Sequence, residues 1–216
     1  MPHDYKKEQK ELYQPKTTPS IVDVPIMAFI MIDGAGDPNT SQEYRSAIET
    51  LYGLCYTIKM SKKRAGGTPD GYFDYVVPPL EGLWSLNDGG EFKGGGAMVP
   101  HKDALLWTAM IRQPEFVTSD VFYEAKDILG TKKPHLDISR ARLALFAEGL
   151  CVQALHQGPY DDEPGTVLAI DRYAAEHGYV VAIDQVRRHH EIYLSDPGKV
   201  APEKLKTVIR HPIKEA

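Results

Sequence analysis

A repeated order of predicted elements constrains the fold of this sequence more than any other feature. An apolar, β-branched segment ending in a glycine turn is followed by a helical pattern and two further strand-like segments, and the second half repeats this order. Matching strings accompany the repeat: Ile-Arg-Gln-Pro at 111–114 and Ile-Arg-His-Pro at 209–212, Pro-Leu-Glu-Gly-Leu at 79–83 and His-His-Glu-Ile-Tyr-Leu at 189–194, and the turns at Gly34 and Gly158. The sequence therefore predicts two strand-helix-strand-strand halves, at about 20–133 and 149–216.

Two such halves predict an α+β fold built on an antiparallel sheet. Each half alone leaves one face of its sheet uncovered, so the halves are expected to pair about a pseudo-twofold axis, with the helices on one side. A ligand groove is then expected between the halves, where their two main helices approach each other. On this interpretation residues 20–216 form a single domain.

The individual elements follow from local patterns. In the first half these predict strands at 21–34, 72–84 and 104–112, helices at 41–60 and 121–129, and a loose glycine-rich turn at 89–96. The strand at 72–84 is expected to be bent or at a sheet edge, because Pro78 and Pro79 interrupt it. In the second half the patterns predict strands at 149–156, 190–194 and 206–213 and a helix at 164–177.

Two segments fit the repeat less well. Residues 1–19 are rich in Lys, Glu, Gln and Pro without apolar periodicity, which predicts a flexible N-terminal arm. Residues 134–148 contain good helix formers at helical spacing, yet they lead directly into a strand. Helix and strand therefore both stay open for that segment.

Charge and hydropathy favour a cytoplasmic protein. The net charge of −5 and the pI near 5.9 give no attraction to phosphate backbones, so no direct nucleic-acid partner is expected. No apolar run approaches the roughly 18 to 20 residues that a membrane span requires, and the first residues are charged and polar rather than signal-like. We therefore expect neither a membrane partner nor a secretory signal.

Glu191 is the leading candidate for a functional carboxylate. It lies in the short apolar segment 190–194, where a glutamate points either to solvent or into the expected groove. Glu81 stands in the matching string of the first half, so an inward-facing pair across the groove is predicted. A carboxylate in aromatic surroundings suits recognition of a cationic or hydrogen-bonding ligand, or general-base activation of a water.

The aromatic residues supply candidate walls for that groove. Trp84 and Trp107 are the two tryptophans, on the second and third predicted strands of the first half. One interpretation places both in the core. The other joins them with Tyr75, Tyr160 or Tyr193 as plates that sandwich a flat aromatic small molecule, each large contact contributing about 1 to 3 kcal/mol.

Other chemistries find less support. His156, His189 and His190 do not fall at metal-binding spacing with a Cys or carboxylate partner. A phosphate-binding loop follows a strand and precedes a helix, and none of the glycine clusters has this context. No Ser or Cys occupies a nucleophile elbow. No metal and no cofactor is therefore predicted.

Three strings resemble the GyrI-like small-molecule-binding family. They are Gly-Leu-Cys-Val-Gln-Ala-Leu-His-Gln-Gly-Pro-Tyr-Asp-Asp-Glu-Pro at 149–164, His-Glu-Ile-Tyr-Leu-Ser-Asp-Pro at 190–197 and Lys-Leu-Lys-Thr-Val-Ile-Arg at 204–210. The likeness covers nearly the whole chain from about residue 20. With the strings at 78–84 and 110–117, the chain resembles the stand-alone branch that includes the cyclopropanoid cyclopropyl hydrolases. These enzymes lack a DNA-binding domain and open the cyclopropane of DNA-alkylating natural products by adding water.

The resemblance implies roles for particular residues. Glu191 matches the family's central pocket glutamate, which orients and deprotonates a water, and Trp84 and Trp107 match its aromatic walls. The pocket tyrosine matches Tyr193 or Tyr160, whose hydroxyl donates to the conjugated ketone that takes up the released electrons. Ser85 follows Trp84 where some relatives carry a second tryptophan, so the shape of one wall differs from theirs.

The implied function is detoxification and drug resistance by hydrolysis of a strained electrophilic ring. The alternative is a non-catalytic module that senses or sequesters a ligand, or that acts as a gyrase-inhibitor-type interaction module. The 20 residues before the predicted fold are too few for the helix-turn-helix of regulator relatives, which favours hydrolysis or sequestration. The sequence leaves the physiological ligand, turnover and oligomeric state open.

Overall fold

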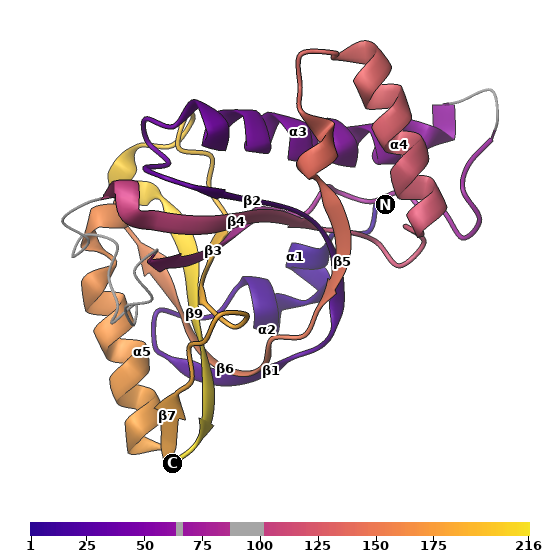
Figure 1. Cartoon of the computed structure of the whole chain (residues 1–216). Coiled ribbons are helices and arrows are strands. Elements are labelled where there is room, and N and C mark those ends of the chain that lie inside the picture. Colours follow the sequence, from indigo (N-terminus) through magenta and orange to yellow (C-terminus); the bar gives the residue numbers. More distant parts are fainter. Residues whose placement is uncertain (64–66, 87–101) are drawn as a thin grey trace.

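The computed structural model describes residues 1–63, 67–86 and 102–216 and has an α+β fold (Figure 1). Eight strands follow one curled antiparallel path in the order β1-β6-β9-β8-β3-β4-β2-β5, and the short β7 pairs with β9. The strands are β1 (Ser20–Val24), β2 (Met27–Ala35), β3 (Leu80–Leu86), β4 (Leu105–Arg112), β5 (Arg142–Phe146), β6 (Gly149–Gln157), β7 (Tyr179–Val181), β8 (His189–Tyr193) and β9 (Lys206–Glu215). The helices are α1 (Tyr5–Glu8), α2 (Lys10–Tyr13), α3 (Gln42–Lys59), α4 (Ser119–Lys132) and α5 (Pro164–Glu176). The turn predicted at 89–96 lies outside the described residues.

The order of the strands confirms the predicted duplication. The first half contributes β3-β4-β2 and the second β8-β9-β6, and the halves join where β3 pairs with β8. The outer strands are exchanged between halves: β1 precedes β2 but pairs with β6, whereas β5 precedes β6 but pairs with β2. Segment 134–148, for which the sequence allowed either helix or strand, contains a 3-10 turn (Ile138–Arg140) and β5. Pairing with β2 favours the strand over the helix.

Prolines set the strand boundaries that differ from the prediction. The strand expected at 21–34 is divided into β1 and β2 around Pro25. Strand β3 begins only after Pro78 and Pro79, so the strand predicted at 72–84 loses its first part. Proline has no amide hydrogen to donate to a sheet ladder, which explains both interruptions.

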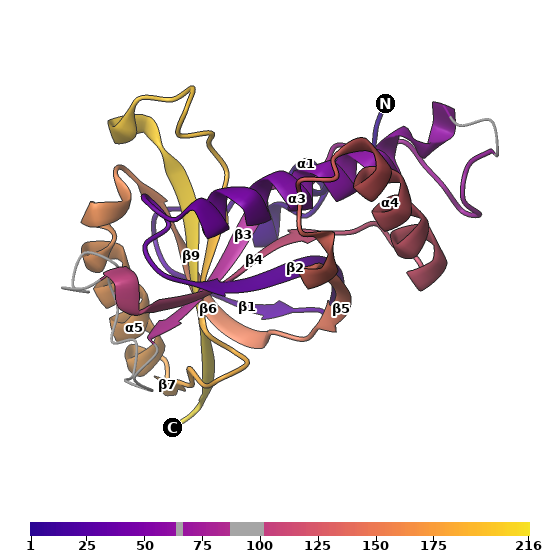
Figure 2. The same ribbon diagram turned by 45° about the horizontal axis from the view of Figure 1, so that its top comes forward.

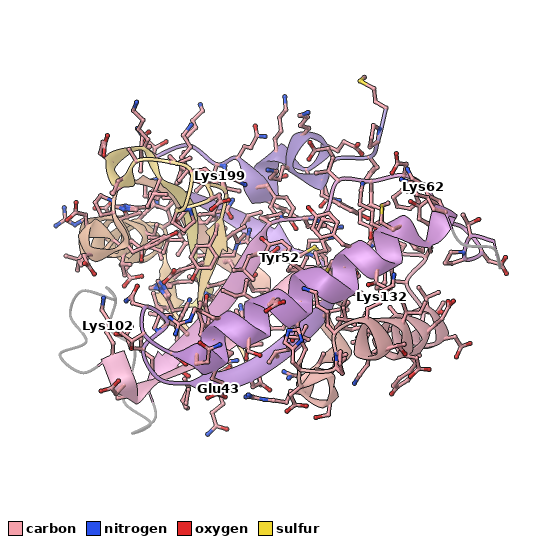
Figure 3. The ribbon with its side chains drawn as sticks, turned by 90° about the horizontal axis from the view of Figure 1, so that it is seen from above. Glu43, Tyr52, Lys62, Lys102, Lys132 and Lys199 are labelled. Carbon is pink, nitrogen blue, oxygen red and sulfur yellow. The ribbon has the colours of Figure 1, made fainter. Side chains whose placement is uncertain are left out.

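Helices α3 and α5 cover the outer face of the sheet, as predicted, and α4 packs beside α3 (Figure 2). Helix α3 begins after Ser41, whose hydroxyl accepts from the amide of Tyr44, and it buries Leu51, Leu54 and Ile58. It packs on β2 and β4 with α4 beside its C-terminal half (Figure 3), whereas α5 packs on β6 and β9. Strands β3 and β8 thus lie between the two helix-covered halves. In the described ranges, no helix is both long and apolar enough to cross a membrane.

The first residues do not form the predicted flexible arm. Helices α1 and α2 lie within the curve of the sheet (Figure 1), where Tyr5 and Tyr13 are each 1 % exposed. The Arg210 guanidinium also donates to the carbonyl of Leu12 at 2.9 Å. The prediction of an arm was wrong because helices of 4 residues are too short to show a helical period in the sequence.

Trypsin is expected to cut slowly at Lys6, Lys7 and Lys10, because cleavage there requires α1 and α2 to unfold and expose buried tyrosines. Mass spectrometry of a native digestion time course measures the rates. Lys199, whose side chain is 80 % exposed outside any helix or strand, is the internal control. Release of the N-terminal segment as fast as cleavage at Lys199 would contradict its docking.

Candidate functional site

Glu191 lies on β8 in the middle of the outer face, together with His189 and Tyr193. Alternate residues of a strand share a face, so these three side chains point the same way. The Tyr193 hydroxyl donates to Glu191 Oε2 at 2.8 Å, and His189 Nε2 lies 3.1 Å from Glu191 Oε1. Glu191 is 9 % exposed, so its carboxyl group is largely enclosed and is held at both oxygens.

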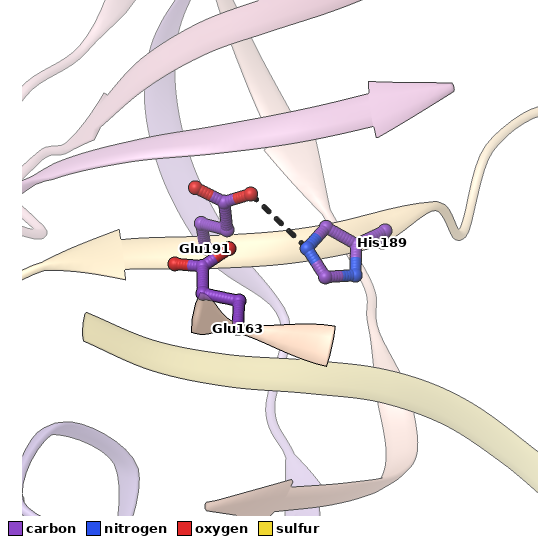
Figure 4. Close-up of side chains that lie close together, drawn as sticks. All are labelled: Glu163, His189 and Glu191. Atoms are coloured by element: carbon purple, nitrogen blue, oxygen red, sulfur yellow. Dashed lines mark hydrogen bonds and ion pairs between the residues drawn. The ribbon is translucent and has the colours of Figure 1, made fainter. Parts of the chain in front are cut away.

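A second carboxyl group, that of Glu163, faces Glu191 (Figure 4). Glu163 immediately precedes α5, is 1 % exposed, and has no hydrogen-bond partner for Oε1 within the part of the chain that the structure describes. Burial, together with the charge of Glu191, raises the pKa of Glu163 well above its usual range, which favours the protonated form of this carboxyl group. The sequence pattern does not single out Glu163, because a Glu before Pro164 matches an ordinary helix start.

Aromatic side chains surround the two carboxyl groups. Trp84 Nε1 donates to the Tyr193 hydroxyl at 3.1 Å, and Tyr160 lies edge-on to Tyr193 with ring centroids 5.8 Å apart. From α3, Tyr44 packs against Trp84 and Trp107 with ring centroids at 5.9 and 5.0 Å. Burial raises the pKa of Tyr193 well above its usual range and that of Tyr160 to about 12, so both hydroxyls keep their protons at neutral pH.

These side chains define the Glu191 cluster: Glu191, Glu163, His189, Tyr193, Trp84, Tyr160 and Tyr44. Of the site residues predicted from the sequence, the structure brings together Glu191, Tyr193, Trp84 and Tyr160. Trp107 is 1 % exposed and reaches the cluster through Tyr44, so it forms a second layer behind the wall.

Glycines allow both indoles to lie flat against the sheet. Gly82 pairs with Glu191 across the junction of β3 and β8, and a Cβ at Gly82 would lie 2.7 Å from Trp84 Nε1. A Cβ at Gly34 would lie 2.2 Å from the ring of Trp107. Any larger residue at these positions would displace the indole above it.

Gly82→Ala is expected to weaken binding of a planar polycyclic dye about tenfold, which corresponds to about 1.4 kcal/mol. The added methyl group displaces the Trp84 indole and also approaches the Tyr193 hydroxyl to 3.1 Å. Tryptophan fluorescence titration measures the affinity. Gly165→Ala, at a position with no atom within 4 Å of the new methyl group, is the matched control. Equal affinities of the two variants would argue against Trp84 as a ligand wall.

The predicted pairing of Glu81 with Glu191 is wrong, because the two side chains lie on opposite faces of the sheet. Ile111 and Ile209 match in the sequence repeat, and they pair with Leu80 and Glu191 respectively. The duplication therefore aligns Glu191 with Leu80, one residue away from Glu81. A shift of one residue along a strand turns a side chain to the other face.

Glu81 belongs instead to a buried charged network on the inner face. His190 places Nε2 2.9 Å from Glu81 and Nδ1 2.9 Å from Glu148, and Arg210 donates to Glu148 at 2.9 Å. All four residues are at most 2 % exposed. Burial opposes the charged form of His190, but the carboxylates of Glu148 and Glu81 raise its pKa to about 9. The charges of His190 and Arg210 likewise outweigh burial and lower the pKa of Glu148 to about 2.

This network predicts that the protein loses stability at alkaline pH. The folded-state pKa of His190, about 9, exceeds its ordinary value of 6.5, so its stabilisation is fully present below pH 6.5 and is lost as the pH rises through 9. The free energy of unfolding, measured by urea denaturation, is expected to fall by about 3 kcal/mol over this window. His190→Gln is expected to have a lower and flatter profile, and a flat wild-type profile would contradict the role of His190.

Tyr75 is the other proposed ligand-binding residue that lies elsewhere. It precedes β3, forms a bridge with His3 and is 1 % exposed. Its ring packs against Phe116 with centroids 5.9 Å apart. Tyr75 therefore belongs to the core around Phe116 and not to the Glu191 cluster.

Three members of the cluster lie close enough to contact one cation. Glu163, His189 and Glu191 each offer one oxygen or nitrogen atom, and these atoms lie within 4.8 Å of one another. The sequence-based expectation of a site without metal or cofactor therefore stays a prediction.

Comparisons with known proteins agree with this architecture. Residues 115–214 match the GyrI-like small molecule binding domain. A crystal structure of an uncharacterized conserved protein from Listeria innocua is 45% identical with a TM-score of 0.90, over 98% of this chain and 100% of that chain. A second crystal structure, described as a hydrolase from Listeria innocua, is 44% identical with a TM-score of 0.87 over the same shares. The EcmrR C-terminal domain, 10% identical with a TM-score of 0.52 over 92% of this chain and 98% of that chain, shares the fold. No curated protein matches the sequence.

The family match and the Glu191 cluster coincide. Both facing carboxyl groups, Glu163 and Glu191, lie within the residues that match the family model, and the Listeria innocua structures extend the similarity over nearly the full chain. The chain therefore belongs to the GyrI-like family, whose domain binds small molecules.

Proposed function

We propose that the protein binds flat aromatic small molecules at the Glu191 cluster and adds water to a strained electrophilic ring, as a detoxifying hydrolase. One observation carries the proposal: two buried carboxyl groups, Glu191 and Glu163, face each other among aromatic side chains. Paired carboxyl groups in unequal environments commonly divide into a base and an acid. The Listeria innocua relative described as a hydrolase supports the same class of reaction.

Glu191 is the general base in this proposal. Its two oxygens are held by the Tyr193 hydroxyl at 2.8 Å and by His189 at 3.1 Å, which fixes the direction from which it accepts a proton. A base held in this way removes a proton from a water while the water attacks carbon. The surrounding aromatic rings hold the flat substrate and keep bulk water away.

The reaction is a ring opening by hydration. The water oxygen bonds to a cyclopropane carbon as its proton passes to Glu191, and the carbon-carbon bond of the cyclopropane breaks. The electron pair moves into a conjugated ketone, whose oxygen takes up a proton. Burial raises the pKa of Glu163 and of Tyr193 well above their usual ranges, which favours the protonated form of each group, so both are suited to donate to that oxygen.

The proposal is tested by incubation with a spirocyclopropyl cyclohexadienone, which combines the strained ring with the conjugated ketone. The expected product has gained one water, detected by mass spectrometry, and carries heavy oxygen when the reaction is run in heavy-oxygen water. Unchanged substrate after many equivalents of enzyme would reject the hydrolase proposal.

Binding without turnover is the second candidate function. The family match supports a small-molecule-binding domain, and a ligand-sensing or sequestering module uses the same aromatic walls. Saturable quenching of tryptophan fluorescence by the substrate, without product, would favour this candidate. Capture of gyrase subunits that is unaffected by Trp107→Ala would favour the inhibitor-type module instead.

A further inference from the structure

A chain of hydrogen-bonding groups leads from Glu191 to the protein surface. His189 Nε2 lies 3.1 Å from Glu191 Oε1, and His189 Nδ1 lies 2.7 Å from Nε2 of His211 on β9. Nδ1 of His211 in turn lies 2.7 Å from Oδ1 of Asp171 on α5. Both imidazoles are 0 % exposed, whereas the Asp171 side chain is 32 % exposed. Three elements thus supply one connected path from a buried carboxyl group to one that solvent reaches.

The number of protons in this chain is set by its contacts. Each of the three hydrogen bonds needs one hydrogen, but two neutral imidazoles supply only two, because each carries a single ring hydrogen. Carboxylates only accept, so neither Glu191 nor Asp171 contributes a hydrogen when ionised. The complete chain therefore holds one additional proton, which belongs to the chain and not to a fixed residue.

Two arrangements with neutral rings satisfy every contact. With the additional proton on Glu191, both imidazoles carry hydrogen on Nδ1 and Asp171 is a carboxylate. With the proton on Asp171, both imidazoles carry hydrogen on Nε2 and Glu191 is a carboxylate that accepts from His189. Moving each hydrogen across its own hydrogen bond converts one arrangement into the other, and no atom or electron pair is gained or lost.

We propose that His189, His211 and Asp171 form a proton relay, through which a carboxyl group at the surface sets whether Glu191 is a base or an acid. The catalytic consequence rests on the proposed function, whereas the relay is a property of the resting protein. Burial lowers the pKa of His189, although the hydrogen bond to Glu191 acts in the opposite direction. The ring therefore does not retain a second proton, which supports transfer of the proton through the two imidazoles.

Other titratable groups border the relay at its inner end. Glu163 and Tyr193 face Glu191, and burial raises the pKa of each group well above its usual range, which favours the protonated forms. The His190 cation lies on the opposite face of β8, where Glu81 and Glu148 hold it. Asp171, at the outer end, is the member of the relay that solvent reaches.

Nitrogen-15 NMR of the imidazole rings tests the relay without any substrate. Asp171→Asn removes the carboxyl group at the surface end of the relay. It is expected to shift the ring nitrogens of His189, which is linked to Asp171 only through His211. Glu191→Gln is expected to shift the ring nitrogens of His211 in the same indirect way. Glu176→Gln, the same change at an exposed carboxyl group of α5, is expected to leave both rings unchanged. Shifts confined to the nearest ring in both relay variants would overturn the relay.

Turnover of the spirocyclopropyl cyclohexadienone adds a functional readout. Asp171→Asn is expected to lower kcat about tenfold with KM unchanged and to move the midpoint of the pH-rate profile, and Asp171→Glu is expected to restore both. A purely structural role of Asp171 predicts a lower Tm with an unchanged pH midpoint, and that result would overturn the proposal.

The two assays separate failure of the relay from failure of the proposed function. Coupled ring shifts in a wild-type protein that does not turn over the substrate would support the relay and reject the hydrolase. Turnover that requires Glu191, together with ring shifts that stay local, would reject the relay and support the hydrolase.

Discussion

Turnover of the cyclopropane substrate is expected to fall by about 10²- to 10⁴-fold when Glu191 is replaced by Gln. The amide retains the shape of the side chain and accepts from the Tyr193 hydroxyl, but it cannot remove a proton from water. Affinity for the substrate is expected to change less than about threefold, because the aromatic walls stay in place. Single-turnover kinetics and fluorescence titration measure the two quantities separately.

A matched exposed carboxylate controls for a general loss of negative charge near the site. Asp161 lies in the 3-10 turn Tyr160–Asp162 beside the cluster, and its side chain is 72 % exposed. Asp161→Asn is expected to retain wild-type turnover. A similar loss in both variants, or full turnover in Glu191→Gln, would remove Glu191 from the role of base.

The sequence predicted the fold through its repeat, because a duplicated pattern and short apolar segments determine which strands neighbour each other. Register was harder to predict. The strings around Glu81 and Glu191 align by residue type, yet the sheet aligns Glu191 with Leu80 through the pairings of Ile111 and Ile209. Similarity of residue types in a short strand does not fix the alignment to within one residue. A shift of one residue places a side chain on the opposite face of the sheet.

The carboxyl pair itself could be predicted only in part. Glu191 carries a signal, because it interrupts an apolar strand next to two histidines. Glu163 carries none in its local pattern, since its partner lies 28 positions along the chain, counted from 163 to 191, and only the packing of α5 on the sheet brings the two together. Contacts of this kind depend on tertiary structure, which periodicity does not encode.

The N-terminal segment was mispredicted for a related reason. Its composition resembles a flexible tail, but Tyr5 and Tyr13 supply the apolar cover for the inner face, and its carbonyl groups meet buried donors such as Arg210. The charged network beneath it is what makes such a polar segment compatible with burial.

Arg210→Met is expected to lower the free energy of unfolding by about 3 to 5 kcal/mol, because removing one partner leaves a buried charge incompletely paired. Arg210 is 1 % exposed and donates to Glu148 at 2.9 Å, to the side chain of Gln153 at 3.0 Å and to the carbonyl of Leu12 at 2.9 Å. Met fills much of the same volume but offers none of these donors. Urea denaturation monitored by tryptophan fluorescence measures the loss.

An ion pair at the surface is the control that separates the effect of burial from the effect of losing an ion pair. Lys133 Nζ lies 2.7 Å from Glu49, but the two side chains are 42% and 47% exposed, so Lys133→Met is expected to change the free energy of unfolding by less than about 1 kcal/mol. Because α2 lies over the Arg210 network, Arg210→Met is also expected to speed tryptic cleavage at Lys10, whereas Lys133→Met leaves that rate unchanged. Equal effects of the two substitutions on stability would show that the inner network does not hold the N-terminal segment to the sheet.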